Sequence, residues 1–179
     1  MNKQLEFRLS GSGGQGLILA GIILADCAIK EGKNAIQTQS YGPEARGGAS
    51  KAEVIISCKE IDFPKVRVPD VFLAMTQVAF DKYSDKIDEN SVIIVDDTIE
   101  LDKDKIKCKE IISLPIIKSA HEEIGKGIVA NIIALGVLQS ATEVVTREML
   151  EKSILDRVPK GTEDLNSKAL HLGFNLLKR

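Results

Sequence analysis

The fold is decided by residues 5–32, which read LEFRLSGSGGQGLILAGIILADCAIKEG. Leu5–Ser10 predicts a first strand, and the glycine-rich stretch Gly11–Gly16 ends it. Residues 15–31 then predict a helix, for which Gly32 is a suitable C-terminal stop. Because this helix is apolar on nearly every side, we expect it to be buried. A strand, a glycine turn and a buried helix together indicate the opening unit of an α/β fold.

The rest of the chain continues to alternate between strands and helices, which predicts a three-layer α/β/α sandwich of the Rossmann-like kind. The connection between the second and third strands is too short to hold a crossover helix, so we expect a mainly parallel but mixed sheet. We expect one domain over residues 1–179. The further strands are expected at Ala35–Ser40, Ala52–Cys58, Val71–Thr76, Val92–Asp96 and Ile111–Leu114, and the helices at about Gln77–Ile87, Ile124–Ala141, Thr146–Arg157 (with Thr146 as N-cap) and Asp164–Lys178.

Composition excludes several classes of protein. The 179 residues are 44% hydrophobic with no Trp, which predicts an aliphatic core. The net charge is −2 with mixed signs, so we expect no nucleic-acid partner. No apolar run reaches the ~18–20 residues of a membrane span, and no signal peptide is evident, so we expect no membrane association. Cys27, Cys58 and Cys108 lie far apart, which fits a reducing, cytoplasmic location and predicts no cluster or metal site in this chain.

The first candidate site is the glycine loop, which fits the pattern G-x-G-x-x-G between a strand and a helix. We expect Gly11 to permit a tight turn, Gly13 and Gly14 to let the backbone approach a ligand, and Gly16 to allow close helix–sheet packing. The helix N-terminus would favour a phosphate or carboxylate. A purely structural turn is the alternative. The candidate ligand-binding residues here are Gly11, Ser12, Gly13, Gly14, Gln15 and Gly16.

An ordinary nicotinamide dehydrogenase is disfavoured by the second strand. That class places an acidic residue at the end of the strand to bind the ribose hydroxyls. Ile36–Ser40 contains no Asp or Glu. The loop therefore indicates an anion-binding helix start more than a dinucleotide site.

The second candidate site is the loop at residues 41–48, YGPEARGG, which would leave the same edge of the sheet as the glycine loop. Tyr41, Glu44 and Arg46 supply a ring, an acid and a forked cation, and Arg46 could pair with a phosphate or a partner's carboxylate. The alternative is a rigid loop held by an internal Glu44–Arg46 pair. Asn131 lies within an apolar helix, so we expect its amide to bond backbone or a neighbouring loop, or to touch a ligand.

Three motifs in order resemble the gamma subunit of 2-oxoacid:ferredoxin oxidoreductases: GSGGQG at residues 11–16, QSYGPEARGG at residues 39–48 and ANIIALG at residues 130–136. The resemblance covers essentially the full length. The wording of the second loop looks most like the 2-oxoglutarate type, and branched-chain 2-oxoacids remain an alternative.

The resemblance implies a multi-subunit enzyme that converts a 2-oxoacid, coenzyme A and oxidised ferredoxin into acyl-CoA, CO2 and reduced ferredoxin. Thiamine diphosphate with Mg and the iron–sulfur clusters would belong to the alpha, beta and delta subunits. The gamma subunit would pack against the catalytic subunits and could position coenzyme A in a cradle formed by the two loops. The rival is a stand-alone nucleotide- or anion-binding regulatory module. The sequence also allows a homodimer of the isolated chain.

The chain shows no spacing of Ser, His, Asp or Cys that indicates a catalytic set, and it contains two His residues. Asp96 and Asp97 end a strand, where metal ligands often lie, but successive strand residues point to opposite faces. We therefore expect neither a metal site nor catalysis by this chain alone.

Overall fold

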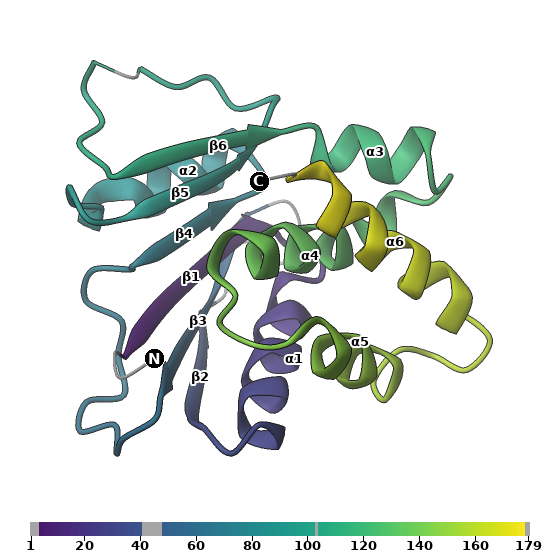
Figure 1. Cartoon of the computed structure of the whole chain (residues 1–179). Coiled ribbons are helices and arrows are strands. Elements are labelled where there is room, and N and C mark those ends of the chain that lie inside the picture. The colour runs from purple at the N-terminus through teal and green to yellow at the C-terminus, as the bar shows by residue number, and fades with distance from the viewer. Residues whose placement is uncertain (1–3, 41–47, 103, 178–179) are drawn as a thin grey trace.

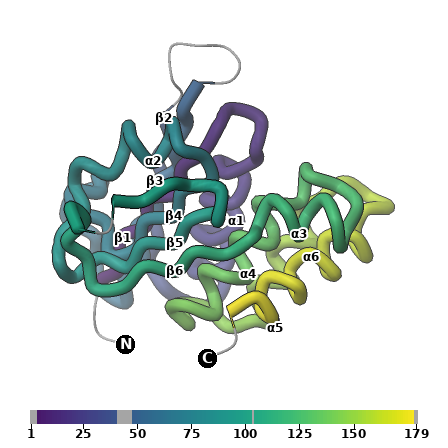
Figure 2. Tube along the Cα trace, turned by 90° about the horizontal axis from the view of Figure 1, so that it is seen from above, coloured from purple at the N-terminus to yellow at the C-terminus, as the bar shows by residue number. Residues whose placement is uncertain are grey.

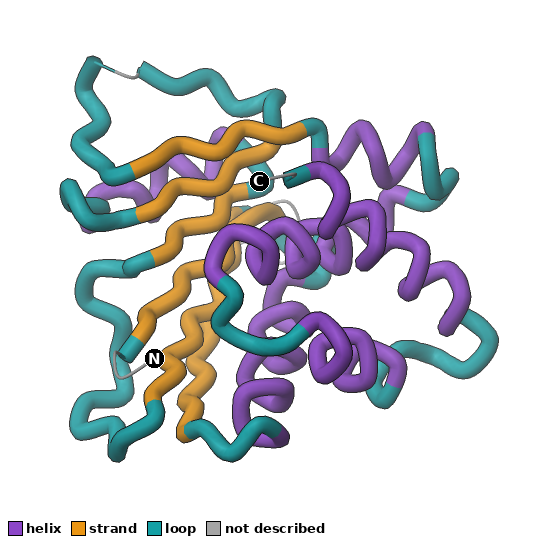
Figure 3. The backbone as a smooth tube through the Cα atoms, viewed as in Figure 1, coloured by secondary structure: helices purple, strands orange, loops and turns teal. Residues whose placement is uncertain are grey.

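A six-stranded mixed sheet is the centre of the molecule in the computed structural model, which describes residues 4–40, 48–102 and 104–177. Within these residues the strands are β1 (Leu5–Ser12), β2 (Asn34–Ser40), β3 (Ala49–Ser57), β4 (Val71–Ala74), β5 (Val92–Asp96) and β6 (Glu110–Leu114). Their order across the sheet is β2-β3-β1-β4-β5-β6 (Figures 1 and 3).

The direction of the strands confirms the predicted mixed sheet. Strands β1, β4, β5 and β6 are parallel, whereas β3 is antiparallel to both β1 and β2. Strand β2 therefore runs in the same direction as β1, and the carboxyl ends of five strands meet at one edge. This carboxyl edge is where ligands bind in most open α/β sheets.

Helices cover both faces of the sheet unequally (Figures 1 and 2). Strand residues such as Phe7, Leu9 and Leu73 share a large core with the helices of one face, while Phe72 and Ile93 share a smaller core with α2 on the other. The helices of the described chain are α1 (Leu17–Lys30), α2 (Gln77–Tyr83), α3 (Ile116–Glu122), α4 (Ala130–Thr142), α5 (Arg147–Leu155) and α6 (Glu163–Leu176), with 3-10 turns η1 (Ser84–Lys86) and η2 (Gly127–Val129). In the described residues, none of these helices has the length and apolarity that crossing a bilayer requires.

Two expectations about helices are wrong. The helix expected from Ile124 begins as α4 at Ala130, and a short helix, α3, lies at residues to which we assigned no element. The burial of α1 is also incomplete, because Ile29 is 57% exposed and Leu19 is 37% exposed. The apolar side chains of α1 are therefore buried on the sheet side but open along another side.

Candidate functional site

The glycine loop at the carboxyl end of β1 closes on itself through Gln15. The Gln15 side-chain oxygen Oε1 accepts a hydrogen bond from the Ser12 amide at 2.7 Å, and the Gln15 amide donates to the Ser12 carbonyl at 3.2 Å. Gly14 and Gly16 have φ of 95° and 74°, a region that side chains other than glycine disfavour. These two glycines let the chain turn from β1 into α1 within four residues.

The glycine loop and the described end of the second loop lie together. The Gly13 amide donates to the Gly48 carbonyl at 3.0 Å, and Ser12 of β1 pairs with Ala49 of β3. Strand β2 ends at Ser40, opposite Lys51 of the same strand β3. Both ends of the second loop therefore reach the carboxyl edge beside the glycine loop, although Tyr41, Glu44 and Arg46 themselves lie outside the described residues.

The backbone groups that remain for a ligand are fewer than the motif alone suggests. The amides of Ser12, Gly13 and Gln15 already donate to protein oxygens. In the described chain this leaves Gly14, Gly16 and the first turn of α1 as unpaired amide donors, at the positive end of the helix dipole. Gly13 and Gly14 are exposed. An anion at this edge would therefore meet the start of α1.

Two glycines have roles that differ from the expected ones. Gly11 lies within β1 and forms no tight turn. A larger residue does not fit there, because its side-chain carbon would lie 2.4 Å from Gln15 Oε1. Gly16 faces α4 and not the sheet, since a side-chain carbon there would lie 2.6 Å from Asn131 Nδ2. Both glycines serve the packing of the loop.

Asn131 joins α4 to the glycine loop. Its side chain is 5% exposed, and Nδ2 donates to the Gly16 carbonyl at 3.1 Å. The expectation that this amide bonds backbone of a neighbouring loop is confirmed, and its contact with a ligand stays a prediction. Asn131 holds Gly16 in place and so fixes the start of α1.

Sequence reasoning missed a surface pocket at the same carboxyl edge. Its volume is about 660 Å³, and Gln77, Thr98, Glu100, Leu101 and Asp102 line it. The Gln77 side chain crosses from α2 to this segment, where its oxygen accepts from the Glu100 amide at 2.8 Å. Two acidic side chains make the pocket unfavourable for a polyanion, and no local pattern in the sequence links its two segments.

The buried Asp96 holds the start of α3. Its Oδ2 accepts from the Ile117 amide at 2.8 Å, and its Oδ1 accepts from the Thr98 amide at 3.1 Å. The residue before the helix is Pro115, which has no polar side chain, so Asp96 serves as the cap from the neighbouring strand. Among the described residues no group of His, Cys, Asp and Glu could hold a metal ion.

Cys27 is the most buried of the three thiols and has no exposure. Burial raises its pKa to about 12, and Glu31 adds to the rise. A thiol that stays protonated is a poor nucleophile, so Cys27 belongs to the core.

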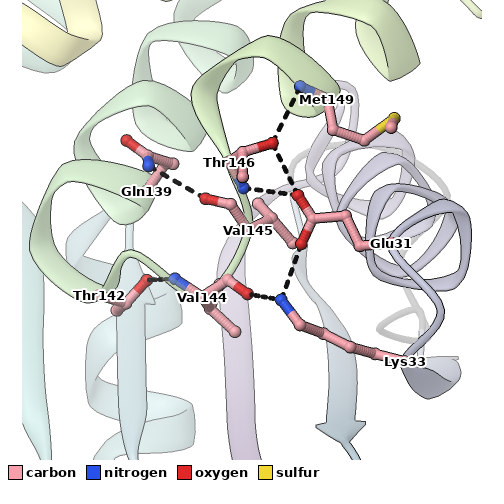
Figure 4. Close-up of polar contacts among 8 residues, drawn as sticks. All are labelled: Glu31, Lys33, Gln139, Thr142, Val144, Val145, Thr146 and Met149. Atoms are coloured by element: carbon pink, nitrogen blue, oxygen red, sulfur yellow. Dashed lines mark hydrogen bonds and ion pairs between the residues drawn. The ribbon is translucent and has the colours of Figure 1, made fainter. Parts of the chain in front are cut away.

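A second polar cluster lies at the other end of α1, around the connection between α4 and α5 (Figure 4). Glu31 Oε1 accepts from the amide and the hydroxyl of Thr146 at 2.6 and 2.8 Å, and Oε2 pairs with Lys33 Nζ at 2.7 Å. Lys33 also donates to the Val144 carbonyl. These contacts fasten the end of α1 to the start of α5.

The fold and the site define a class: an α/β domain with a glycine loop at the carboxyl edge of a mixed sheet. The family model for pyruvate ferredoxin/flavodoxin oxidoreductase matches residues 6–176. The chain belongs to this family.

One relative of nearly the same length and one longer relative support this assignment. The 2-oxoglutarate synthase subunit KorC of Methanocaldococcus jannaschii is 51% identical over 175 residues, which are 97% of this chain and 94% of the relative. The ketoisovalerate oxidoreductase subunit VorA of Methanothermobacter marburgensis is 33% identical over 77% of this chain but only 28% of its own length.

Solved structures agree with the fold. The gamma subunit of the keto/oxoacid ferredoxin oxidoreductase from Geobacter sulfurreducens has a TM-score of 0.86, with 46% identity, over 97% of this chain and 96% of its own. The 2-oxoglutarate:ferredoxin oxidoreductase from Magnetococcus marinus, solved with 2-oxoglutarate, coenzyme A and succinyl-CoA, also has a TM-score of 0.86. Its identity is 24% over 98% of this chain and 31% of its own, so this likeness concerns the fold.

Proposed function

We propose that the chain is the gamma subunit of a 2-oxoacid:ferredoxin oxidoreductase that uses 2-oxoglutarate. The observation that carries this proposal is the identity of 51% and 44%, over nearly the full chain, with subunits of 2-oxoglutarate synthase from two methanogens. A branched-chain 2-oxoacid is the second candidate, since a ketoisovalerate oxidoreductase subunit is 33% identical over 77% of the chain.

In this proposal the chain works only within a complex. The complex converts 2-oxoglutarate, coenzyme A and oxidised ferredoxin into succinyl-CoA, CO2 and reduced ferredoxin. Thiamine diphosphate, Mg and iron–sulfur clusters lie on the alpha, beta and delta subunits, in keeping with the few and dispersed thiols of this chain. Residues 1–179 act as one domain, because elements from both ends of the chain share the large core. The complex is cytoplasmic.

The chain's own contribution is to the binding of coenzyme A. The two loops form a cradle for its phosphates, in which the amides of Gly14 and Gly16 and the start of α1 supply the backbone part. Arg46 supplies the cation, and Tyr41 and Glu44 of the same loop are the further candidate contacts. Support comes from the Gly13–Gly48 hydrogen bond of 3.0 Å, which joins the end of the second loop to the first. A helix start and a guanidinium are both favourable partners for phosphate.

Co-purification tests the proposal against its rival, a stand-alone anion-binding regulatory module. The tagged chain, purified without oxygen from the cells that make it, is expected to bring down thiamine-binding and cluster-binding partner chains in fixed stoichiometry. Mass spectrometry identifies the partners. A chain that is recovered alone at its own molecular mass would favour the regulatory module.

The cradle is tested separately with Arg46→Ala in the assembled enzyme. Loss of one cation–phosphate contact, worth about 1.5–3 kcal/mol, is expected to raise the KM for coenzyme A by about tenfold or more, with the KM for the 2-oxoacid unchanged. The matched control is Arg67→Ala, because Arg67 stacks on Phe63 near the amino end of β1, away from the loops. An unchanged KM for coenzyme A would show that Arg46 has no part in the cradle; loss of assembly would assign it to a subunit interface.

A further inference from the structure

We propose that two copies of this chain pair through β2 and α1 about a two-fold axis at Gln37, so that their sheets continue into one another. Strand β2 is an edge strand of the sheet, and none of its residues is buried. Its seven residues contain neither a charged side chain nor a proline, and its pairing with β3 has no bulge.

Proteins usually protect a sheet edge with charge, proline or a bulge, because an open edge pairs with other strands. The opposite edge follows this rule. Strand β6 is five residues long, carries Glu110 and ends before Pro115. Strand β2 lacks such protection, which indicates that its edge has a partner.

The hydrogen-bonding direction of β2 follows from its neighbours. The Glu6 amide donates to Asp70 and the Ser10 carbonyl accepts from Met75. The backbone amide and carbonyl groups of the even-numbered residues of β1 therefore point toward β4. Along a strand, the backbone groups of successive residues point alternately to the neighbouring strand on one side and to the neighbour on the other. Through the registers Leu9↔Ala52 and Thr38↔Glu53, the even residues of β2 then bond β3.

The outward backbone groups of β2 are therefore those of Ala35, Gln37 and Gln39. This set is symmetric about Gln37. An antiparallel second copy centred there pairs Gln37 with its own equivalent and Ala35 with Gln39, and every outward amide and carbonyl of the three residues gains a partner. On the other face of the sheet, Ile36 lies opposite Thr38 of the second copy, a pair of branched side chains that packs well.

Helix α1 supplies the second half of the surface. Ile18, Ile22, Ala25 and Ile29 have the spacing of one helix face. Of these, Ile18 and Ile22 are half-buried and Ile29 is 57% exposed. Asp26 and Lys30 pair with Arg157 and Asp156, which follow α5, on another side of the helix. The stripe therefore faces away from α5 and past β2. In Figure 1, β2 and α1 lie side by side at the same end of the molecule.

Strand β2 and the apolar stripe of α1 lie on the same proposed two-fold axis. A side-chain carbon on Gly21 would lie 3.8 Å from Gln37 Cγ, which places the neighbouring Ile22 level with the centre of β2. Each side chain on a two-fold axis meets its own copy, and a charge there would meet a like charge. Neither β2 nor the stripe of α1 carries a charge, so a second copy of this chain can pair with this surface without bringing like charges together.

Sedimentation equilibrium of the full chain tests the proposal. The wild-type chain is expected to be a dimer. Gln37→Pro removes an outward amide without breaking a bond to β3, and Ile22→Lys places two like charges at the axis; each is expected to raise the dimer dissociation constant about tenfold or more. Ile128→Lys is the matched control, since Ile128 is 75% exposed and lies three residues before Asn131, which bonds Gly16 at the carboxyl edge. Circular dichroism checks that the variants fold.

Cross-linking gives a positive test. Residues 37 of the two copies form a hydrogen-bonded pair with Cα atoms about 5.5 Å apart, within disulfide reach. In a Cys58→Ser background, Gln37→Cys is expected to give a covalent dimer on mild oxidation, and Ser113→Cys on β6 is expected not to. A monomeric wild-type chain, a dimer broken by Ile128→Lys, or the absence of a Gln37→Cys dimer would overturn the proposal. None of these outcomes bears on co-purification with other subunits.

Discussion

Glu31 shows how one side chain fastens three segments of the chain. Its carboxylate is 13% exposed and receives Thr146 on one oxygen and Lys33 on the other. Burial by itself would raise the pKa of Glu31, but the bonds from Lys33 and Thr146 outweigh it and hold this pKa below its ordinary value. Thr146 in turn caps α5 by accepting from the Met149 amide at 3.3 Å, which confirms the expected N-cap.

We predict that Glu31→Gln lowers the free energy of unfolding by about 1–2 kcal/mol at neutral pH, since charge-assisted hydrogen bonds become neutral ones. A carboxylate whose pKa is lower in the folded state stabilises the fold above its unfolded pKa, and this contribution is lost as the pH falls through the folded value. Urea unfolding from pH 7 to pH 3 measures the difference between the two proteins, which should shrink below about pH 4.3.

Glu89→Gln is the control for Glu31→Gln, because Glu89 is an exposed residue of a turn. It should change the free energy of unfolding by less than about 0.5 kcal/mol. A constant difference between wild type and Glu31→Gln across the whole pH range would contradict the assignment of the stabilisation to the ionised carboxylate.

At the scale of elements, α4 and α6 cross at two glycines. A side-chain carbon on Gly173 would lie 2.2 Å from the Ile133 carbonyl, and one on Gly136 would lie 2.5 Å from the Leu170 carbonyl. Both obstacles are backbone atoms, which cannot move aside as a flexible side chain does. The two helices therefore approach closely because neither carries a side chain at the crossing.

We predict that Gly173→Ala lowers the free energy of unfolding by about 1–3 kcal/mol, because overpacking at the crossing exceeds the gain in helix propensity of about 1 kcal/mol. Thermal unfolding followed by circular dichroism measures the effect. Lys168→Ala, at an exposed position of the same helix, should be neutral. If Gly173→Ala raised the melting temperature, the close crossing would be wrong.

Local sequence patterns predicted the elements that are determined by residues close to them in the chain. The short connection after Ser40 predicted an antiparallel β2–β3 pair, and Thr146 marked the start of α5. Helix α3 could not be predicted in this way, since its cap is Asp96, some twenty residues earlier in the chain. The open stripe of α1 also escaped prediction, because composition gives the apolarity of a helix but not the number of neighbours that cover it.

At the scale of the molecule, the sequence located the candidate site but not its internal bonds. Both loops were expected at one edge, and the described ends meet there through Gly13 and Gly48. The Gln15 side chain occupies the Ser12 amide, a donor that the motif offers to an anion, and Asn131 binds the Gly16 carbonyl; only the folded contacts reveal these two bonds. The ligand roles of the candidate residues stay predictions, and Tyr41, Glu44 and Arg46 lie outside the described residues.

At the largest scale, this chain serves an enzyme that oxidises 2-oxoglutarate. The most direct test of this role is the anaerobic assay of the co-purified complex, in which ferredoxin reduction is followed with 2-oxoglutarate and, in parallel, with 3-methyl-2-oxobutanoate. We expect reduction that requires coenzyme A and has a kcat/KM at least about tenfold higher for 2-oxoglutarate, a difference of about 1.4 kcal/mol between the two transition states. Preference for the branched substrate, or reduction that does not depend on coenzyme A, would contradict the account.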